Sequence, residues 1–359
     1  MSQTWLRIGG AVIAFAVATI AGIVSLGTFN AAPDSTGVNV TGANSFALIL
    51  AIALVLAFVV YAAIEYLQTR RFDSISRQFD TRTIVLMPLA IAINIILGAA
   101  VGQVLKIPIY LDSIGTILVG ALAGPIPGAL TGFVSNILST YAVPPPFHSD
   151  TLAAFAVVAA VIGLLAGMFG RVGWLRPRPD RSYSELAVGA GVAVVLVVGL
   201  SYLAFIGYKA VLGETSLAPT GGNTVFVALG YLALLLVAGT VVGLIVLLFV
   251  RRDLTASYVV VAGVATGIIA ALISAPISAN VYGGITGAGT DFLVAAFRQA
   301  GADVQAATLG QGLVSDPIDK VTTFFVVYLI LSAMAVRTKA RFPQGELLVG
   351  GEELGGTTA

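Results

Sequence analysis

The chain alternates long apolar stretches with short polar connections. A helix that crosses a bilayer needs roughly 20 mainly apolar residues, and eight stretches reach about that length. They are 5–29, 45–67, 84–105, 150–170, 185–212, 224–250, 257–281 and 316–336. Two shorter apolar stretches, 111–124 and 126–142, are joined by a Gly-Pro turn. The pattern predicts an all-α, polytopic membrane helix bundle.

The two shorter stretches decide how many times the chain crosses the membrane. At about 1.5 Å per residue, 111–124 is about 21 Å long, whereas the apolar core of a bilayer is roughly 30 Å thick. This stretch is therefore either a thin crossing or one half of a re-entrant hairpin buried in protein. Helix 84–105 ends on the side from which helix 150–170 starts, so an even number of crossings lies between them. We expect ten transmembrane helices.

Positive charge is concentrated in alternate connections. Fourteen of the eighteen Lys and Arg residues lie in five short segments, and the positive-inside rule places such segments in the cytoplasm. They are Arg7; Arg70, Arg71, Arg77 and Arg82; Arg171, Arg176, Arg178 and Arg181; Arg251 and Arg252; and Arg337, Lys339 and Arg341. The remaining four, Lys106, Lys209, Arg298 and Lys320, lie in the other connections. We expect a multi-pass protein of the cell (inner or plasma) membrane with both termini in the cytoplasm.

The amino-acid composition excludes several classes of function and of binding site. Charged residues make up 10% of the 359 residues, against about 25% in soluble domains, so most of the outer surface must face lipid. A net charge of +1 argues against a nucleic-acid partner. The chain has no cysteine, one histidine (His148) and no P-loop motif. We expect no metal site, no cofactor, no ATP binding by this chain and, without a nucleophile-base pair, no enzymatic activity.

Three polar side chains lie within or beside the apolar stretches of the first half. Asn94 and Asn136 need hydrogen-bond partners inside a membrane, so they either bridge neighbouring helices or line a polar cavity. Asp112 precedes Ser113 near the start of stretch 111–124. It either caps that helix or places a carboxylate at the mouth of a cavity.

The last apolar stretch opens with Ser315-Asp316-Pro317-Ile318-Asp319-Lys320. Asp316 at the N-cap, Pro317 at N1 and Asp319 at N3 would form a conventional helix start. Lys320 is left unexplained, because it lies on the side where positive charge is sparse. It either pairs with Asp316 or Asp319, or it faces a cavity and meets an anionic group.

A glycine-rich run follows stretch 257–281. Residues 280–291 begin with Asn280 and contain Tyr282 and four glycines, and an amphipathic stretch follows. This segment either lies in the membrane interface or forms a mobile cover over a site.

Small residues recur at every fourth position on two apolar stretches. They are Ala90, Gly98 and Gly102, with Asn94 in the same row, and Ala159, Gly163 and Gly167. Such rows let helix backbones approach closely, so each row either packs within the bundle or docks a partner subunit.

Two glycine motifs flank the turn between the shorter stretches. They read Gly120-Ala121-Leu122-Ala123-Gly124-Pro125 and Gly128-Ala129-Leu130-Thr131-Gly132. This arrangement resembles the substrate-binding (S) components of energy-coupling factor (ECF) transporters, in which a short helix ends in G-A-x-x-G-P and the next begins G-A-x-x-G. The segment 316–320, followed by an apolar helix and a basic end, also resembles the last helix of many S components. The similarity covers roughly 84–170 and 257–337, six helices in all.

The resemblance implies a six-helix subunit that captures a vitamin or similar micronutrient, in complex with a membrane coupling subunit and cytoplasmic ATPases. In the family a row of small residues on the first core helix contacts the coupling subunit; here Asn94 interrupts that row. The organisation we expect is 1–83, two N-terminal helices and a cytoplasmic linker; 84–337, the S-component-like core with a two-helix insertion at 185–250; and 338–359, a disordered cytoplasmic tail.

We therefore expect a membrane subunit that binds a small metabolite in an outward-facing cavity, with ATP hydrolysis supplied by other subunits. The alternative is an S-component-like membrane sensor or assembly subunit without transport. The candidate substrate-binding residues are Asn94, Asp112, Asn136, Asn280, Tyr282, Asp316 and Lys320.

Overall fold

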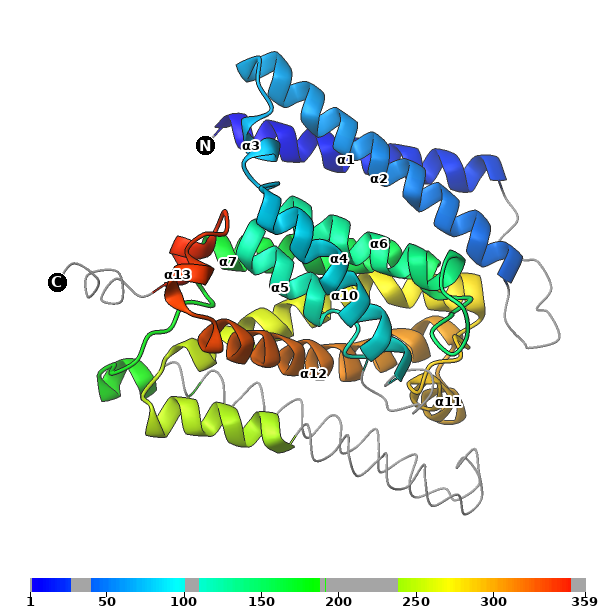
Figure 1. Cartoon of the computed structure of the whole chain (residues 1–359). Coiled ribbons are helices and arrows are strands. Elements are labelled where there is room, and N and C mark those ends of the chain that lie inside the picture. Colours follow the sequence, from blue (N-terminus) through cyan, green and yellow to red (C-terminus); the bar gives the residue numbers. More distant parts are fainter. Residues whose placement is uncertain (1, 27–39, 101–109, 188–190, 192–237, 350–359) are drawn as a thin grey trace.

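The computed structural model describes residues 2–26, 40–100, 110–187, 191 and 238–349, and its regular elements are helices (Figure 1). Five of the described helices are long and apolar enough to cross a membrane. They are Leu6–Ser25, Thr41–Thr69, Thr81–Gly98, Leu152–Arg171 and Thr255–Tyr282. The described chain is thus an all-α membrane helix bundle with several crossings. Most of the expected crossing 185–212 and about half of 224–250 lie outside the described residues, so the count of ten stays a prediction.

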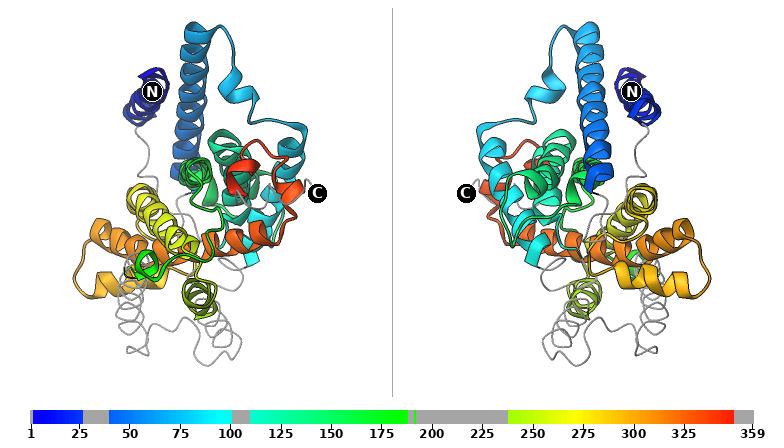
Figure 2. Two further views of the ribbon diagram at one scale, coloured as in Figure 1. Left: turned by 90° about the vertical axis from the view of Figure 1, so that its left-hand side faces the viewer. Right: turned by 90° about the vertical axis from the view of Figure 1, so that its right-hand side faces the viewer.

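Helices α1 (Ser2–Leu26) and α2 (Val40–Thr69) form a pair beside the other helices (Figure 2). Helix α1 packs on α2 and leaves large apolar side chains such as Val24 exposed. The first half of α2 is buried through small residues such as Ala47 and Ala53, because this half contacts the core. A short helix, α3 (Asp73–Ser76), leads from the pair into the core.

The core contains two closely packed groups of helices. The first group holds α4 (Thr81–Gly98), α5 (Ile114–Ala123), α6 (Pro125–Tyr141), the short η2 (Leu152–Phe155) and α7 (Ala156–Arg171). The second group pairs α10 (Thr255–Tyr282) with α12 (Val304–Ala333), and α11 (Asp291–Gln299) packs on α12. Figure 1 shows α3 and α13 (Val336–Lys339) at one end of the bundle and α11 at the other. The first end carries the arginine clusters and is called the arginine-rich end below.

The rows of small residues pack inside the bundle. A side chain at Gly163 of α7 would collide with the backbone of Gly128 on α6, and one at Gly115 of α5 would collide with Ala90 on α4. Ala90, Asn94 and Gly98 are buried, and Gly102 lies outside the described residues. Close backbone approach explains why small residues are needed at these positions. The row on 84–105 is therefore turned inward and is not a free docking face.

Helix α12 begins twelve residues earlier than the sequence pattern predicts. Asp303, not Asp316, is its N-cap, and the Asp303 carboxylate accepts a 2.7 Å hydrogen bond from the backbone N–H of Ala306. Pro317 lies within the helix, where it packs against Gly267 of α10. The expected capping roles of Asp316 and Asp319 were wrong, because a proline inside a membrane helix resembles a helix start when only the sequence is read.

The segment after α12 is ordered as far as residue 349. Helix α13 packs on the short η4 (Gly345–Leu348), and η4 folds back against α5 and α7, with Leu348 and Val349 buried. The backbone N–H of Gln344 donates a 2.8 Å hydrogen bond to the carbonyl of Leu122. The disordered tail expected from residue 338 is therefore not found at 338–349, and residues 350–359 lie outside the described part.

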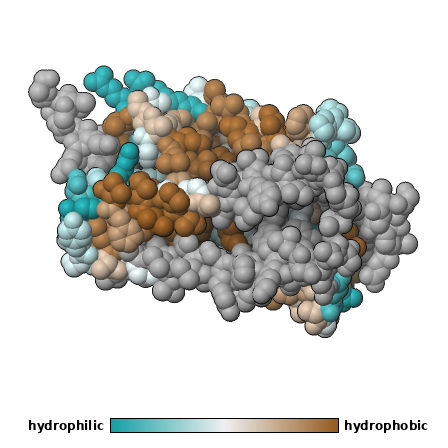
Figure 3. Space-filling model, turned by 90° about the horizontal axis from the view of Figure 1, so that it is seen from below, coloured by the Kyte–Doolittle hydropathy of each residue, from teal (hydrophilic) through white to brown (hydrophobic). Residues whose placement is uncertain are grey.

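The described surface matches a membrane setting. Many exposed side chains of α1, α2 and α4 are large and apolar, including Val12, Val55 and Val85. Figure 3 shows apolar residues across the middle of one face, with hydrophilic residues gathered toward its ends. A belt of this kind is what a bilayer requires of a helix bundle.

Candidate functional site

The short helix α5 creates the setting of the candidate site. Ten residues at about 1.5 Å each give about 15 Å, half of the roughly 30 Å core. The helix runs toward the arginine-rich end, where the amide oxygen of Gln78 accepts a hydrogen bond from the N–H of Ile126 just after the α5–α6 turn. The N-terminal end of α5 therefore lies within the bundle. The non-helical residues before it, Tyr110–Ser113, place backbone N–H groups and polar side chains there, surrounded by protein.

Asp319 of α12 holds this non-helical segment in place. Its Oδ1 accepts hydrogen bonds from the backbone N–H groups of Tyr110 (3.0 Å) and Leu111 (2.9 Å). Its Oδ2 lies 2.6 Å from Nζ of Lys320, and its side chain is fully buried. Asp319 thus satisfies two backbone donors that no helix satisfies.

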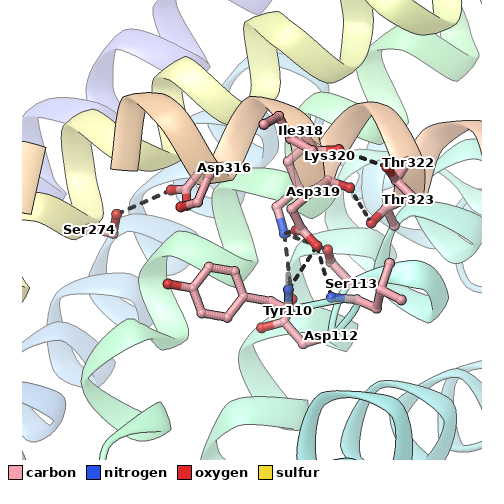
Figure 4. Close-up of polar contacts among 12 residues, drawn as sticks. Tyr110, Asp112, Ser113, Ser274, Asp316, Ile318, Asp319, Lys320, Thr322 and Thr323 are labelled. Carbon is pink, nitrogen blue, oxygen red and sulfur yellow. Dashed lines mark hydrogen bonds and ion pairs between the residues drawn. The ribbon is translucent and has the colours of Figure 1, made fainter. Parts of the chain in front are cut away.

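Lys320 uses all three of its hydrogen-bond donors on neighbouring side chains. Besides Asp319, its Nζ lies 2.8 Å from Oγ of Ser113 and 3.5 Å from Oδ1 of Asp112. Its side chain is 4% exposed, so the ammonium does not reach water. Figure 4 shows these side chains converging from α12 and from the segment before α5. We call Asp112, Ser113, Asp319 and Lys320 the Lys320 cluster. The pairing of Lys320 with Asp319 is the first of the two alternatives left by the sequence.

Asn94 of α4 bridges neighbouring helices. Its Nδ2 donates to the hydroxyls of Thr116 (2.8 Å) and Ser135 (3.0 Å), and its Oδ1 accepts from the backbone N–H of Gly115 (2.7 Å). Asn94 therefore satisfies a donor at the start of α5, the task expected of Asp112. Asp112 instead faces Lys320, and Gly98 provides the room, because a Cβ there would lie 2.9 Å from Cβ of Asp112.

A small polar cavity adjoins the cluster. Its volume is ≈ 10 Å³, about the room that one water needs. Its polar wall contains Asn94, Asp112, Ser135, Asn136 and Ser139, and Phe147 and Leu152 from the connection to α7 close it. The cavity lies in the half of the bundle away from the arginine-rich end, because its α6 residues belong to the second half of that helix.

Two side chains of this wall have no hydrogen-bond partner among the residues that the structure describes. They are the Asn136 amide and the Ser139 hydroxyl, with 5% and 2% of each residue exposed. Neither side chain contains a fully enclosed polar atom that lacks a partner, so both groups keep some accessible surface toward the cavity. Both groups line a space that another molecule can fill.

Asp316 lies one helical turn before Lys320 and forms no ion pair within the described ranges. Its Oδ1 accepts from the Ser315 hydroxyl at 3.1 Å, and its Oδ2 lies 3.5 Å from Oγ of Ser274 on α10 (Figure 4). Gln311 donates to Ser315 and approaches the Tyr110 hydroxyl, which contacts Thr290 at 2.7 Å. Asp316 therefore belongs to a polar chain that leads toward α11, beside the cavity rather than in its wall.

The remaining two candidates do not line the cavity. Asn280 is exposed on α10, where its Oδ1 accepts a 2.8 Å hydrogen bond from Gln305 of α12. Tyr282 is buried, and its hydroxyl donates to the carbonyl of Thr151 at 3.0 Å. Tyr282 thus supports the residue next to Leu152, which closes the cavity. The predicted direct contact of both residues with a ligand is not supported by their positions.

The glycine-rich loop is held by Asp291 rather than left loose. The Asp291 carboxylate accepts hydrogen bonds from the backbone N–H groups of Thr286 and Gly287 and from the Thr286 hydroxyl. The Thr151 hydroxyl reaches the carbonyl of Thr286 at 3.4 Å. The loop therefore touches the segment that closes the cavity and does not itself form the cavity wall.

The sequence did not single out Ser113, Ser139 or Asp319 as parts of one site. Asp319 was assigned to a helix start, and nothing in the sequence links α12 to Tyr110 and Leu111, more than two hundred positions earlier. One available signal was the spacing of Ser135, Asn136 and Ser139, which places three polar residues on adjoining faces of a mainly apolar helix.

Comparison of the chain with protein-family models, with curated proteins and with solved structures finds no match. Function therefore has to be argued from the site itself.

Proposed function

We propose that the chain is the substrate-capture subunit of a vitamin or micronutrient uptake transporter. It binds a small metabolite in a cavity that opens to the outside, while other subunits supply ATP hydrolysis. One observation carries the proposal: Asn136 and Ser139 point free hydrogen-bonding groups into a polar cavity beside Asp112. The resemblance of 110–136 to ECF S components agrees with it.

The cavity has to enlarge for this role. Pockets for small organic molecules measure about 300–1,000 Å³, far more than ≈ 10 Å³. Phe147 and Leu152 close the cavity and belong to the connection between α6 and α7. Movement of this connection would open the site away from the arginine-rich end, the side that the positive-inside rule makes extracellular.

Two asparagines provide a matched test of ligand binding. Small molecules retained by the purified chain would be extracted and quantified by mass spectrometry for the wild type, Asn136→Ala and Asn280→Ala. We expect the Asn136 variant to lose the retained compound, because its amide lines the cavity. The Asn280 variant should retain it, because its amide is bound to Gln305 at the surface. Equal retention by all three proteins would reject this site.

The outward orientation has a separate test. The natural chain has no cysteine, so Ile285→Cys introduces a single thiol in the glycine-rich loop, where Ile285 is exposed. A membrane-impermeant maleimide should label it in intact cells, whereas a cysteine at the exposed Arg77 near α3 should react only after lysis. Labelling in the reverse order would contradict capture from outside.

A membrane sensor or assembly subunit is the second candidate. One observation favours it: the row of Ala90, Asn94 and Gly98 is buried against α5 and cannot dock a coupling subunit as in S components. Affinity purification from the native membrane separates the two roles. A capture subunit should bring ATPases with it, whereas a sensor should bring a kinase or another effector.

A further inference from the structure

The charges around the cavity identify the class of ligand. This step rests on the proposed function, because it assumes that the cavity is a binding site. Lys320 forms ion pairs with two aspartates, Asp112 and Asp319, and a third, Asp316, lies one helical turn away without an ion pair among the described residues. Buried charges are stable only when they are paired or neutralised.

Lys320 is not available to an anionic ligand. An ammonium has three donors, and all three point at Asp319, Ser113 and Asp112. Lys320 is absent from the cavity wall. An anion that recruited it would have to displace one of these three partners.

Asp112 is the charged group that a ligand meets. Among the described residues that line the cavity, Asp112 alone has an ionisable side chain, and 24% of that side chain is exposed. Its 3.5 Å contact with Nζ of Lys320 is longer than the contacts of Nζ with Asp319 and Ser113. Asn94 is fully engaged in hydrogen bonds to its neighbours. The free groups are the Asn136 amide and the Ser139 hydroxyl, and each can offer an oxygen as well as a donor.

We propose that the ligand carries a positive charge, which lies against the Asp112 carboxylate while Asn136 and Ser139 bind its polar substituents or its charged group directly. Phe147 also lines the cavity, and an aromatic ring can attract an organic cation when its face is presented to it. A monovalent metal ion would use the same carboxylate, amide and hydroxyl oxygens. The experiment therefore distinguishes an organic cation from an inorganic one.

The test uses thermal unfolding of the full chain in mild detergent. Yeast extract is separated by ion exchange at pH 7 into cationic, neutral and anionic fractions, and inorganic salts are removed from the cationic fraction. Sodium chloride and potassium chloride are tested in separate samples as sources of inorganic cations. We expect the organic cation fraction to raise Tm by about 5 °C or more. A shift with sodium but not potassium would also support a positively charged ligand, and would assign the site to a metal ion instead of a metabolite.

Two results would overturn the inference in different ways. A shift produced only by the neutral or anionic fraction would refute the positive charge and leave the capture function standing. If no fraction and neither salt changed Tm, the result would count against the positively charged ligand and against the capture function.

Asp112→Asn is the decisive variant, because it keeps the shape of the side chain and removes its charge. We expect it to weaken binding of the active fraction about 10- to 100-fold, the usual effect of losing a charged hydrogen bond. Asp150→Asn is the matched control, since Asp150 is exposed and pairs with His148. Unchanged binding in Asp112→Asn would contradict the assignment.

A second variant guards against misfolding of the first. Asn136→Asp adds a carboxylate to the same wall. It should keep or strengthen binding of a cation and should abolish binding of an anion. Loss of binding in this variant, with the fold intact by size-exclusion chromatography, would refute the proposal.

Discussion

Two buried ion pairs in this bundle make similar hydrogen bonds but differ in the charged groups around them. Lys320 lies 2.6 Å from Asp319 between α12 and the segment before α5, and Arg7 lies 3.1 Å from Glu65 between α1 and α2. Each carboxylate also accepts a backbone N–H from a non-helical or short-helical segment: Asp319 from Tyr110, and Glu65 from Ser74 at 2.7 Å. Each pair therefore ties a helix to a connecting segment.

The surroundings separate the two pairs. Around Glu65 one arginine meets one carboxylate, and Gln68 and Ser74 complete the hydrogen bonds at the arginine-rich end. Lys320 is shared between two carboxylates, Asp319 and Asp112, a third, Asp316, lies one turn away, and a cavity adjoins Asp112. The balanced pair fits a structural role, whereas the surroundings of Lys320 are where we propose that a ligand binds.

Lys320→Met should have the largest effect. It leaves Asp319 charged and buried without its partner, which typically costs about 3–5 kcal/mol. Equilibrium unfolding in mixed micelles would measure the loss. The double variant Lys320→Met/Asp319→Asn should be more stable than the single one, because it removes the orphaned charge. A double variant no more stable than Lys320→Met would show that the pair is not the source of the loss.

Asn94→Ala should have the second largest effect and lower the free energy of unfolding by about 2–3 kcal/mol. The substitution removes three hydrogen bonds and leaves the N–H of Gly115 buried without an acceptor. The same unfolding experiment measures it, and Asn280→Ala is the control, since that amide is exposed. A loss below about 0.5 kcal/mol would mean that Asn94 does not bridge the helices as the structure indicates.

Arg7→Met should cost less, about 1–2 kcal/mol, because this pair lies near the end of the bundle, where water can solvate Glu65 once it is exposed. We expect α1 to detach from α2, which faster proteolysis between them would report. Binding of the retained compound should be unchanged. Loss of binding would instead make the N-terminal pair part of the site.

Asn136→Ala should have the smallest effect on stability, below about 1 kcal/mol, because its amide makes no hydrogen bond within the described part of the chain. Its effect on ligand retention should be large all the same. The contrast with Asn94→Ala would separate a structural asparagine from a binding one. A stability loss as large as that of Asn94→Ala would remove the distinction.

The lengths of the apolar stretches predicted most of the described helices, because hydrophobicity is a local property, whereas the orientation expected from charge stays a prediction. Stretch 257–281 is found as Thr255–Tyr282, and 126–142 as Pro125–Tyr141. The start of α12 was missed, because Asp316 and Pro317 imitate a cap while Asp303 supplies the real one. The fold-back of 338–349 was missed too, because its hydrogen bond to Leu122 and its buried Leu348 depend on tertiary contacts.

The candidate site could be predicted only in part. Asn94, Asp112 and Asn136 were recognised as polar residues in apolar surroundings, and the structure brings them to one cavity. The sequence did not show that Asn94 and Lys320 have no free donors, since saturation depends on partners from other helices. The sequence also did not show that Asn280 and Tyr282 lie outside the cavity wall. Their positions in the sequence of α10 do not reveal which neighbouring residues their side chains contact.

The half-length α5 has a consequence for passage across the membrane. If the cavity takes up a solute as proposed, a solute beside Asp112 lies at the inner start of α5, partway along the bundle. Between that point and the arginine-rich end lie the α5–α6 hairpin, in which α5 is about 15 Å long, and η4, which packs against α5. Glycine contacts such as Gly128 with Gly163 hold that hairpin against α7, so the permeability of this region depends on how tightly those backbones stay together.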